Sequence, residues 1–195
     1  MFNNMTHILL DAARMNEYMS TAQELNKQYD SLYRGGVEES LSEVAPYIFI
    51  FPKNSEFSNW YINSGWGDSW GILLKSSLSL PELHKHFRKF LMVQTEDGDE
   101  LYFRFYDPRV LRIFLPTCNA QQLTQFFGPV QYFFVEQDTD TGLQFWLENG
   151  NLRQQLINVK DYQQNNIVSP IESTGEDLPS NNEHKNKPPG WKLFD

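Results

Sequence analysis

One unbroken apolar and aromatic run, Tyr47-Ile48-Phe49-Ile50-Phe51, constrains the fold of this chain more than any other feature. Pro52 ends the run, which is far shorter than the ~20 residues of a membrane span and fits a strand. A strand without alternating polar residues is covered on both faces. Strand-like and helix-like segments alternate over residues 1–160. The predicted fold class is therefore α/β, with α+β as the alternative: a mixed central sheet flanked by helices.

Local signals place several elements. Ser79 and Glu82 have the spacing of a capping box at the start of a helix, and Pro81 is compatible with a first turn. Asp107-Pro108 and Asn119 open two further helices. Hairpins are predicted for residues 90–95 with 100–105 and for 130–136 with 143–148, and further helices over residues 14–25, 55–64 and 150–159.

The composition changes sharply near the C-terminus. The 28 residues from 163 to 190 hold four aliphatic side chains, no aromatic one and four prolines, which is too little apolar surface for a core. Large apolar groups then return at Trp191, Leu193 and Phe194. We predict an α/β domain over residues 1–160 and an extended polar tail over 161–195 that ends in an aromatic anchor. The anchor either folds back onto its own domain or docks on a partner.

Charge and cysteine content exclude several classes. The sequence has 16 Lys+Arg against 25 Asp+Glu, a net charge of -9, which argues against a nucleic-acid partner. A single cysteine, Cys118, excludes an intrachain disulfide framework and a multi-cysteine zinc site. The N-terminal residues lack the pattern of a targeting signal, so we expect a cytoplasmic protein without a membrane partner.

The candidates for catalysis favour structural interpretations. Cys118 has no motif around it that would activate a nucleophile, and a small buried residue is expected there. His84 and His86 are about 200° apart around a helix, too far to share a metal, and are expected to be exposed. The glycines of residues 65–71 lack the spacing of a phosphate loop and predict a turn with two tryptophans packed beneath it. The sequence thus predicts no catalytic residue, cofactor or metal.

One cluster of basic residues stands out. Six of the sixteen lie in residues 85–112: Lys85, Arg88, Lys89, Arg104, Arg109 and Arg112. Arg104 is placed on the polar face of its strand, with Tyr102 and Tyr106, where it could pair with Asp107 or Glu100. Arg88 could reach the same acidic residues across the hairpin. Three interpretations are open: a structural ion-pair network, a docking surface for an acidic partner segment, and a catalytic or phosphate site.

Several motifs occur in a familiar order. They are Gly65-Trp66-Gly67-Asp68-Ser69-Trp70-Gly71, Leu80 to Arg88, Phe90-Leu91-Met92-Val93, Phe103 to Leu111 (FRFYDPRVL), Phe114-Leu115-Pro116 and Phe127-Gly128-Pro129-Val130. In this the chain resembles the type VI secretion adaptor chaperone family, also called Tap or Tec and first catalogued as a domain of unknown function. The resemblance covers residues 8–155 and is densest over 65–135, and FRFYDPRVL is its most specific part.

The resemblance implies a non-enzymatic role in a bacterial cytoplasm. Members of this family bind a toxic effector protein and help load it onto the VgrG spike of the type VI apparatus. The residues that match the family pattern are Arg88, Arg104, Tyr106, Asp107, Pro108 and Arg109. Many relatives carry a longer helical second lobe where this chain has its polar tail. Two alternatives are an immunity-type inhibitor that neutralises a toxin directly and an enzyme that uses the arginine cluster with Cys118.

Overall fold

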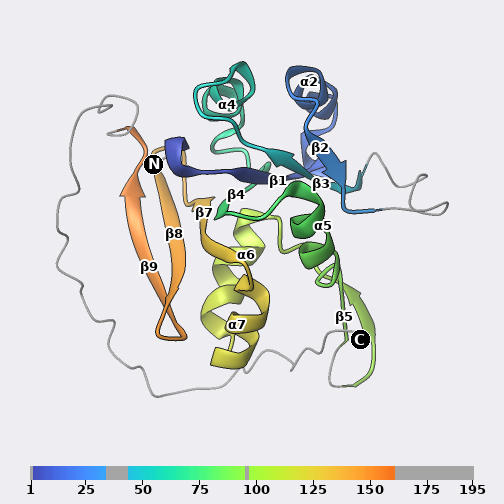
Figure 1. Ribbon diagram of the computed structural model, residues 1–195, viewed down its shortest axis with the longest axis vertical. Helices are drawn as coiled ribbons and strands as arrows, with labels where there is room; N and C mark the ends of the chain where they lie inside the picture. The colour runs from blue at the N-terminus through green and yellow to red at the C-terminus, as the bar shows by residue number, and fades with distance from the viewer. Residues whose placement is uncertain (1, 34–43, 95–96, 161–195) are drawn as a thin grey trace.

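The computed structural model describes residues 2–33, 44–94 and 97–160, which form a central sheet between two layers of helices (Figure 1). The strands are β1 (His7–Asp11), β2 (Tyr29–Ser31), β3 (Pro46–Ile50), β4 (Gly71–Ser76), β5 (Met92–Gln94), β6 (Glu100–Tyr102), β7 (Val130–Glu136), β8 (Thr141–Glu148) and β9 (Asn151–Asn158). The helices are η1 (Phe2–Asn4), α1 (Ala12–Met15), α2 (Tyr18–Leu25), α4 (Glu56–Trp60), η3 (Tyr61–Gly65), α5 (Leu80–Arg88), α6 (Pro108–Phe114), η4 (Leu115–Thr117) and α7 (Ala120–Phe127).

Seven strands form the central sheet in the order β2-β3-β1-β4-β7-β8-β9. The predicted fold class, helices on a central sheet, is confirmed. We expected a sheet of mixed strand direction. Among the described residues, every pairing within this sheet is instead antiparallel. β5 and β6 form a separate two-stranded sheet that is the predicted hairpin.

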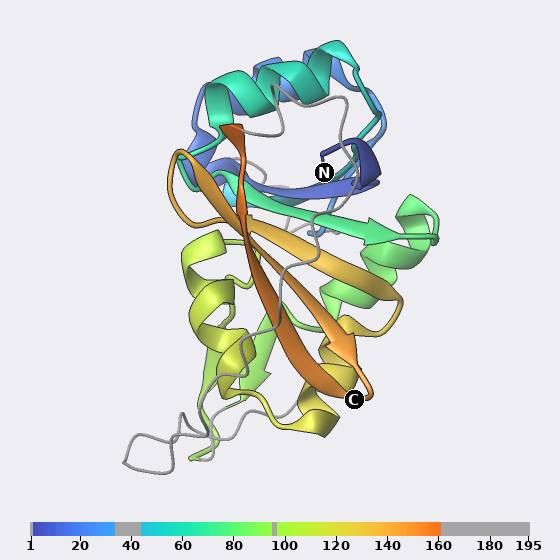
Figure 2. The same cartoon turned by 90° about the vertical axis from the view of Figure 1, so that its left-hand side faces the viewer.

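The central strands are buried on both faces. Leu9 of β1 joins a core cluster with α5, α6 and α7, whereas its neighbours Ile8 and Leu10 join a second cluster with α1, α2 and α4 on the opposite face. The first four residues of β3 are buried, as the apolar run at residues 47–51 predicts. All five residues of the neighbouring β1 are buried as well. Figure 2 shows the two helical layers on either side of the sheet.

Polar caps define the helices of one layer. At α7, the Asn119 side chain accepts a hydrogen bond from the Gln122 backbone N–H, and the Gln122 side chain accepts one from the Asn119 N–H, each at 2.9 Å. At α5, the Glu82 carboxylate accepts the backbone N–H of Ser79 at 2.9 Å. These short-range signals lie entirely in the sequence, and the helices predicted from them are confirmed. The longest described helix, α5, has nine residues, too few to cross a bilayer.

One predicted helix is interrupted and another is wrong. Residues 14–25 are helical at the end of α1 and throughout α2, and Asn16, with a φ of 50°, separates the two helices. Residues 150–159 form the strand β9 instead of a helix. The turn at Asn149-Gly150 has positive φ at both residues, 52° and 77°, which directs the chain back along β8 as a tight hairpin. Strand pairing thus overrides the helix-like spacing of Leu152 and Leu156.

Gly71 is needed where β4 passes β1. A Cβ at this position would lie 2.0 Å from the backbone oxygen of Leu9, which cannot move without opening the sheet. We expect Gly71→Ala to lower the free energy of unfolding by about 3 kcal/mol or more, as measured by urea denaturation. Gly98→Ala is the control, since its Cβ would meet nothing within 4 Å and only the positive φ of 93° opposes it. Equal losses for the two variants would contradict this assignment.

His7 makes stability depend on pH. Burial, together with the nearby Lys75, lowers the pKa of His7 to about 4, so the folded protein holds the ring neutral. Its Nδ1 lies 2.9 Å from the Thr6 hydroxyl oxygen. The unfolded chain takes up this proton near pH 6.5, so the stability contributed by the neutral ring is present above that pH and is lost as pH falls towards 4.

Through His7, acidification from pH 7 to pH 4.5 should lower the protein's free energy of unfolding by about 2 kcal/mol. His7→Gln should remove that part of the pH dependence in urea titrations at the two pH values. Identical pH dependence in the wild-type protein and His7→Gln would show that the ring does not carry the effect.

Candidate functional site

Five of the residues that match the family pattern, between Arg104 and Arg109, lie where the loop after β6 leads into α6. Arg104 and Arg109 each meet a buried carboxylate, Tyr106 is buried beside Arg104, and Pro108 is the first residue of α6. Five of the six predicted motif residues therefore stand together, and Asp11 at the end of β1 joins them. We call these six residues (Asp11, Arg104, Tyr106, Asp107, Pro108 and Arg109) the arginine–carboxylate cluster.

Arg104 pairs with a residue that the sequence analysis did not connect with it. Its Nη2 donates to Oδ2 of Asp11, whose side chain is fully buried, whereas 45% of the Arg104 side chain is exposed. The predicted partners Asp107 and Glu100 are therefore wrong as ion-pair partners. The other oxygen of Asp11, Oδ1, is buried without a hydrogen-bond partner among the described residues. Arg104 is thus the counter-ion that makes a buried carboxylate at this position tolerable.

Tyr106 lies on the inner side of this pair. We predicted it on a polar strand face with Arg104, but β6 ends at Tyr102 and the side chain of Tyr106 is buried. Burial raises the pKa of the Tyr106 hydroxyl, and the negative charge of Asp11 acts in the same direction. A hydrogen bond with Arg104 works against this shift. The phenol therefore stays protonated and serves as a polar contact at the edge of the core.

Asp107 both caps α6 and holds Arg109. Its Oδ1 accepts the backbone N–H of Arg109 at 2.9 Å and the Nε–H at 3.0 Å, while Oδ2 accepts Nη2 at 2.6 Å. Burial alone would raise the pKa of this carboxyl, but the hydrogen bonds and charge of Arg109 lower it overall. Half of the Arg109 side chain remains exposed. Pro108 is buried and starts the helix, so the Asp-Pro-Arg sequence forms one cap.

A second polar cluster ties β7 to the glycine-rich loop before β4. The buried Glu136 accepts the backbone N–H of Gly67 with Oε2 and the hydroxyl of Ser69 with Oε1, both at 2.8 Å. Arg112 of α6 donates to the backbone oxygen of the same Glu136. Neither Asp11 nor Glu136 is among the site residues predicted from the sequence. Each is an acidic residue that directly ends an apolar strand, and this position is the signal that could have singled them out.

The glycine-rich loop packs as predicted. Trp66 stacks on Phe134 with ring centroids 5.1 Å apart, and Trp70 is buried against Trp60 at 5.5 Å. Gly67 adopts a φ of 101° at the loop, which favours glycine. The prediction of a turn above two tryptophans is confirmed, and the loop is part of the second core cluster.

The remaining candidates are Arg88, Cys118 and the C-terminal residues Trp191, Leu193 and Phe194. Arg88 is exposed in the last turn of α5, a favourable position for a cation at a helix C-terminus. Trp191, Leu193 and Phe194 lie outside the described residues. Cys118 is partly buried, its thiol contacts the Phe114 carbonyl oxygen at 3.4 Å, and burial raises its pKa to about 12, so it is not an activated nucleophile.

The two helical histidines are more buried than expected. His84 is buried, with Nε2 2.9 Å from the Ser31 carbonyl oxygen, and His86 places Nε2 2.9 Å from that of Phe126. The expectation of exposed histidines is therefore wrong, because α5 packs against β2 on one side and α7 on the other. Within residues 2–33, 44–94 and 97–160, His, Cys, Asp and Glu do not assemble into a group of three that could hold a metal.

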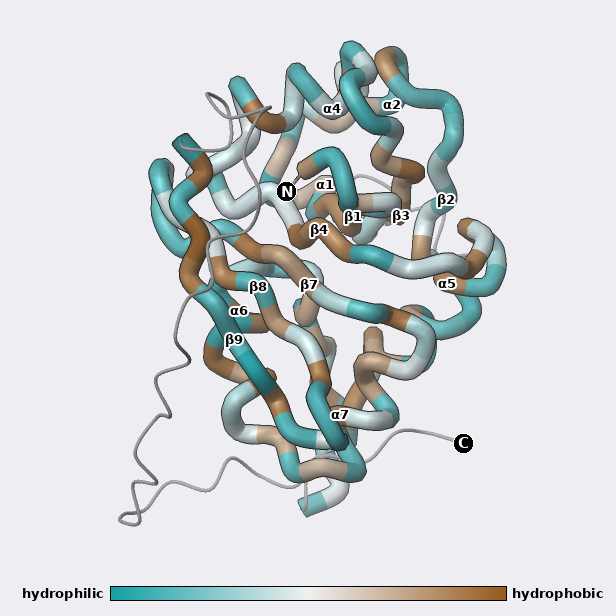
Figure 3. Tube along the Cα trace, turned by 60° about the vertical axis from the view of Figure 1, so that its left-hand side comes forward, coloured by the Kyte–Doolittle hydropathy of each residue, from teal (hydrophilic) through white to brown (hydrophobic). Residues whose placement is uncertain are grey.

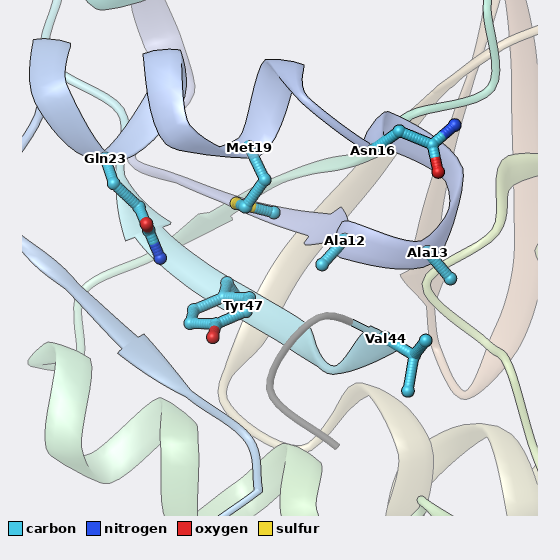
Figure 4. A pocket seen from close by; sticks show the side chains of 7 residues that line it. All are labelled: Ala12, Ala13, Asn16, Met19, Gln23, Val44 and Tyr47. Atoms are coloured by element: carbon cyan, nitrogen blue, oxygen red, sulfur yellow. The ribbon is translucent and has the colours of Figure 1, made fainter. Parts of the chain in front are cut away.

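A hollow of about 510 Å³ lies between the start of α1, α2 and β3. Figure 4 shows its seven lining side chains: Ala12, Ala13, Asn16, Met19, Gln23, Val44 and Tyr47. A second hollow of about 330 Å³ shares Asn16 and extends towards Tyr18 and Trp70. The lining of the larger hollow combines apolar side chains with the amide groups of Asn16 and Gln23 and the ring of Tyr47.

The fold and cluster define an α/β protein in which arginine–carboxylate pairs fix a loop and the start of a helix. The chain belongs to the family described as Domain of unknown function (DUF4123), whose model matches residues 6–125. The match runs from the strand that carries Asp11 to the middle of α7, so it contains the whole cluster but not Glu136. Neither the curated proteins nor the solved structures include a match to this chain.

The two ion pairs should differ in their contribution to stability. Arg104→Met leaves the buried charge of Asp11 without its partner, and we expect a loss of about 2–4 kcal/mol of unfolding free energy. Arg109→Met should cost about 1 kcal/mol, because Asp107 keeps its bond to the helix backbone. Urea denaturation measures both.

A matched double variant tests the cause. Asp11→Asn in the Arg104→Met background removes the unpaired charge and should recover part of the loss. Equal destabilisation by Arg104→Met and Arg109→Met, or no recovery in the double variant, would mean that Asp11 does not depend on Arg104.

Proposed function

We propose that this protein is a non-enzymatic adaptor chaperone that binds a type VI secretion effector and helps to load it onto the VgrG spike. The family match over residues 6–125 overlaps most of residues 8–155, the part of the sequence that resembles the adaptor chaperones. The proposal places the protein in the bacterial cytoplasm, with the effector and the spike protein as its partners.

The observation that carries the proposal is how the most specific motif, Phe103 to Leu111, uses its polar groups. Arg104 and Arg109 bond to carboxylates of their own chain, and Asp107 caps a helix. Groups that are engaged in this way fix the shape of a surface instead of performing proton or group transfer. The high pKa of Cys118 supports the same conclusion, because it removes the thiolate that the enzyme hypothesis requires.

The cluster also offers a means of partner binding. About half of each guanidinium-bearing side chain, Arg104 and Arg109, remains exposed, while the buried carboxylates hold both in place. Cations that are already oriented lose little side-chain entropy when they meet an acidic group of a partner. We therefore place contact with acidic residues of the effector at this surface, as the docking interpretation of the basic cluster expects.

A secretion assay tests the function. We expect deletion of the gene to abolish secretion of one effector, and the wild-type protein and Cys118→Ala to restore it.

A pull-down tests the binding surface. Arg109→Gln should weaken effector recovery by about tenfold. Lys160→Gln, which removes the exposed ion pair of Lys160 with Asp140, serves as the matched control. Co-purified proteins are identified by mass spectrometry.

Normal effector secretion without this protein would overturn the adaptor function. A toxin-protection assay separates the immunity alternative, because an adaptor alone does not rescue a cell from active toxin. Loss of function in Cys118→Ala with binding intact would instead indicate an enzyme.

A further inference from the structure

The strand β9 ends the seven-stranded sheet and leaves a long open edge. It has eight residues, most of them exposed, and no other described strand lies on its outer side (Figure 2). Natural proteins usually protect such an edge with a proline, a bulge or a covering segment. β9 contains no proline and pairs with β8 in continuous register. Figure 3 shows most of β9 as hydrophilic, unlike the central strands.

The hairpin geometry determines which backbone groups point outward. A two-residue turn at Asn149-Gly150 makes Glu148 and Asn151 a hydrogen-bonded pair, and such pairs then recur at every second residue. The bond from the Val159 N–H to the Asp140 oxygen, 2.7 Å long, confirms this alternation at the other end of the hairpin. The odd-numbered residues of β9 therefore bond to β8. The backbone groups of Leu152, Gln154 and Leu156 point away from the sheet.

The outward-bonding residues also carry an apolar surface. Leu156 is 59% exposed although it stands opposite Leu143, which packs against the core of the α6 and α7 layer. Leu152 lies on the same face of β9 and is partly buried against that core. The row of apolar side chains that begins in the core thus reaches the sheet edge uncovered. A further strand beside β9 would cover Leu156 and satisfy the three outward backbone positions together.

The C-terminal residues of the same chain can supply the strand beside β9. Thirty residues, 161–190, separate the end of the described domain from Trp191-Lys192-Leu193-Phe194. Fully extended they span up to ~100 Å, and β9 is only ~27 Å long, so the C-terminal segment can reach any part of the edge in the same molecule. In a strand, Trp191 and Leu193 share one face and Phe194 the other. We infer that residues 191–195 add to the outer edge of β9 as an antiparallel eighth strand, in which Trp191, Leu193 and Asp195 stand opposite Leu156, Gln154 and Leu152. In this register Trp191 covers the exposed side chain of Leu156.

Residue-resolved amide exchange tests this inference on the full-length protein. The amides of Leu152, Gln154 and Leu156 should exchange at least ~100-fold more slowly than in an unfolded chain, because a hydrogen bond to the added strand protects them. In Trp191→Ala/Leu193→Ala they should exchange at least tenfold faster than in the wild-type protein. The amides of Arg153 and Ile157 should not change, since they bond to β8. Ile171→Ala/Leu178→Ala, which removes apolar groups elsewhere in the C-terminal segment, is the matched control and should behave like the wild-type protein.

Three results would overturn the inference. Fast exchange of the three outward amides in the wild-type protein would show an unoccupied edge. Protection that increases with protein concentration would assign the edge to a second copy of the chain. Protection that appears only after an effector is added would assign it to that partner. The first two results need no partner, so they test the inference independently of the adaptor function, and only the third requires an effector.

Discussion

Burial of the central strands on both faces is the constraint on which the rest of this structure depends. β1, β3 and β4 carry large apolar side chains at nearly every position, so neither face can be left to water. Two helical layers therefore cover the sheet, one on each face, and a polar residue that ends such a strand can become buried as well. Asp11 is the direct result: it continues a fully buried strand and needs Arg104 from a segment 93 residues away.

Local signals allowed prediction of the elements but not of their polar partners. The caps of α5, α6 and α7 involve residues three or fewer positions apart, and each was predictable from spacing alone. The partner of Arg104 was not, because β1 comes near the loop before α6 only after the sheet has assembled. The same holds for β9, whose spacing of Leu152 and Leu156 resembles a helix until β8 is available for pairing. Five of the six residues of the cluster could thus be named from the sequence, whereas the pairing of Arg104 with Asp11 could not.

The family match ends inside α7, yet the sheet continues through three more strands. β7 contributes Phe133 to one core and Phe134 to the other, so it lies between the two layers as fully as the strands within the match. β8 and β9 extend the same sheet outward with increasing exposure. The matched region and the strands that follow it therefore share the same two hydrophobic core clusters.

Glu136 has a consequence for how the two helical layers move. Its carboxylate holds the loop of Gly67 and Ser69, which belongs to one layer, and its backbone oxygen accepts Arg112 from the helix of the other. Side chains on opposite faces of a sheet do not touch each other, so a link between the layers needs a residue that bonds to both sides. Glu136 is such a residue: a shift of the tryptophan loop and a tilt of α6 would both act on its hydrogen bonds to Gly67, Ser69 and Arg112.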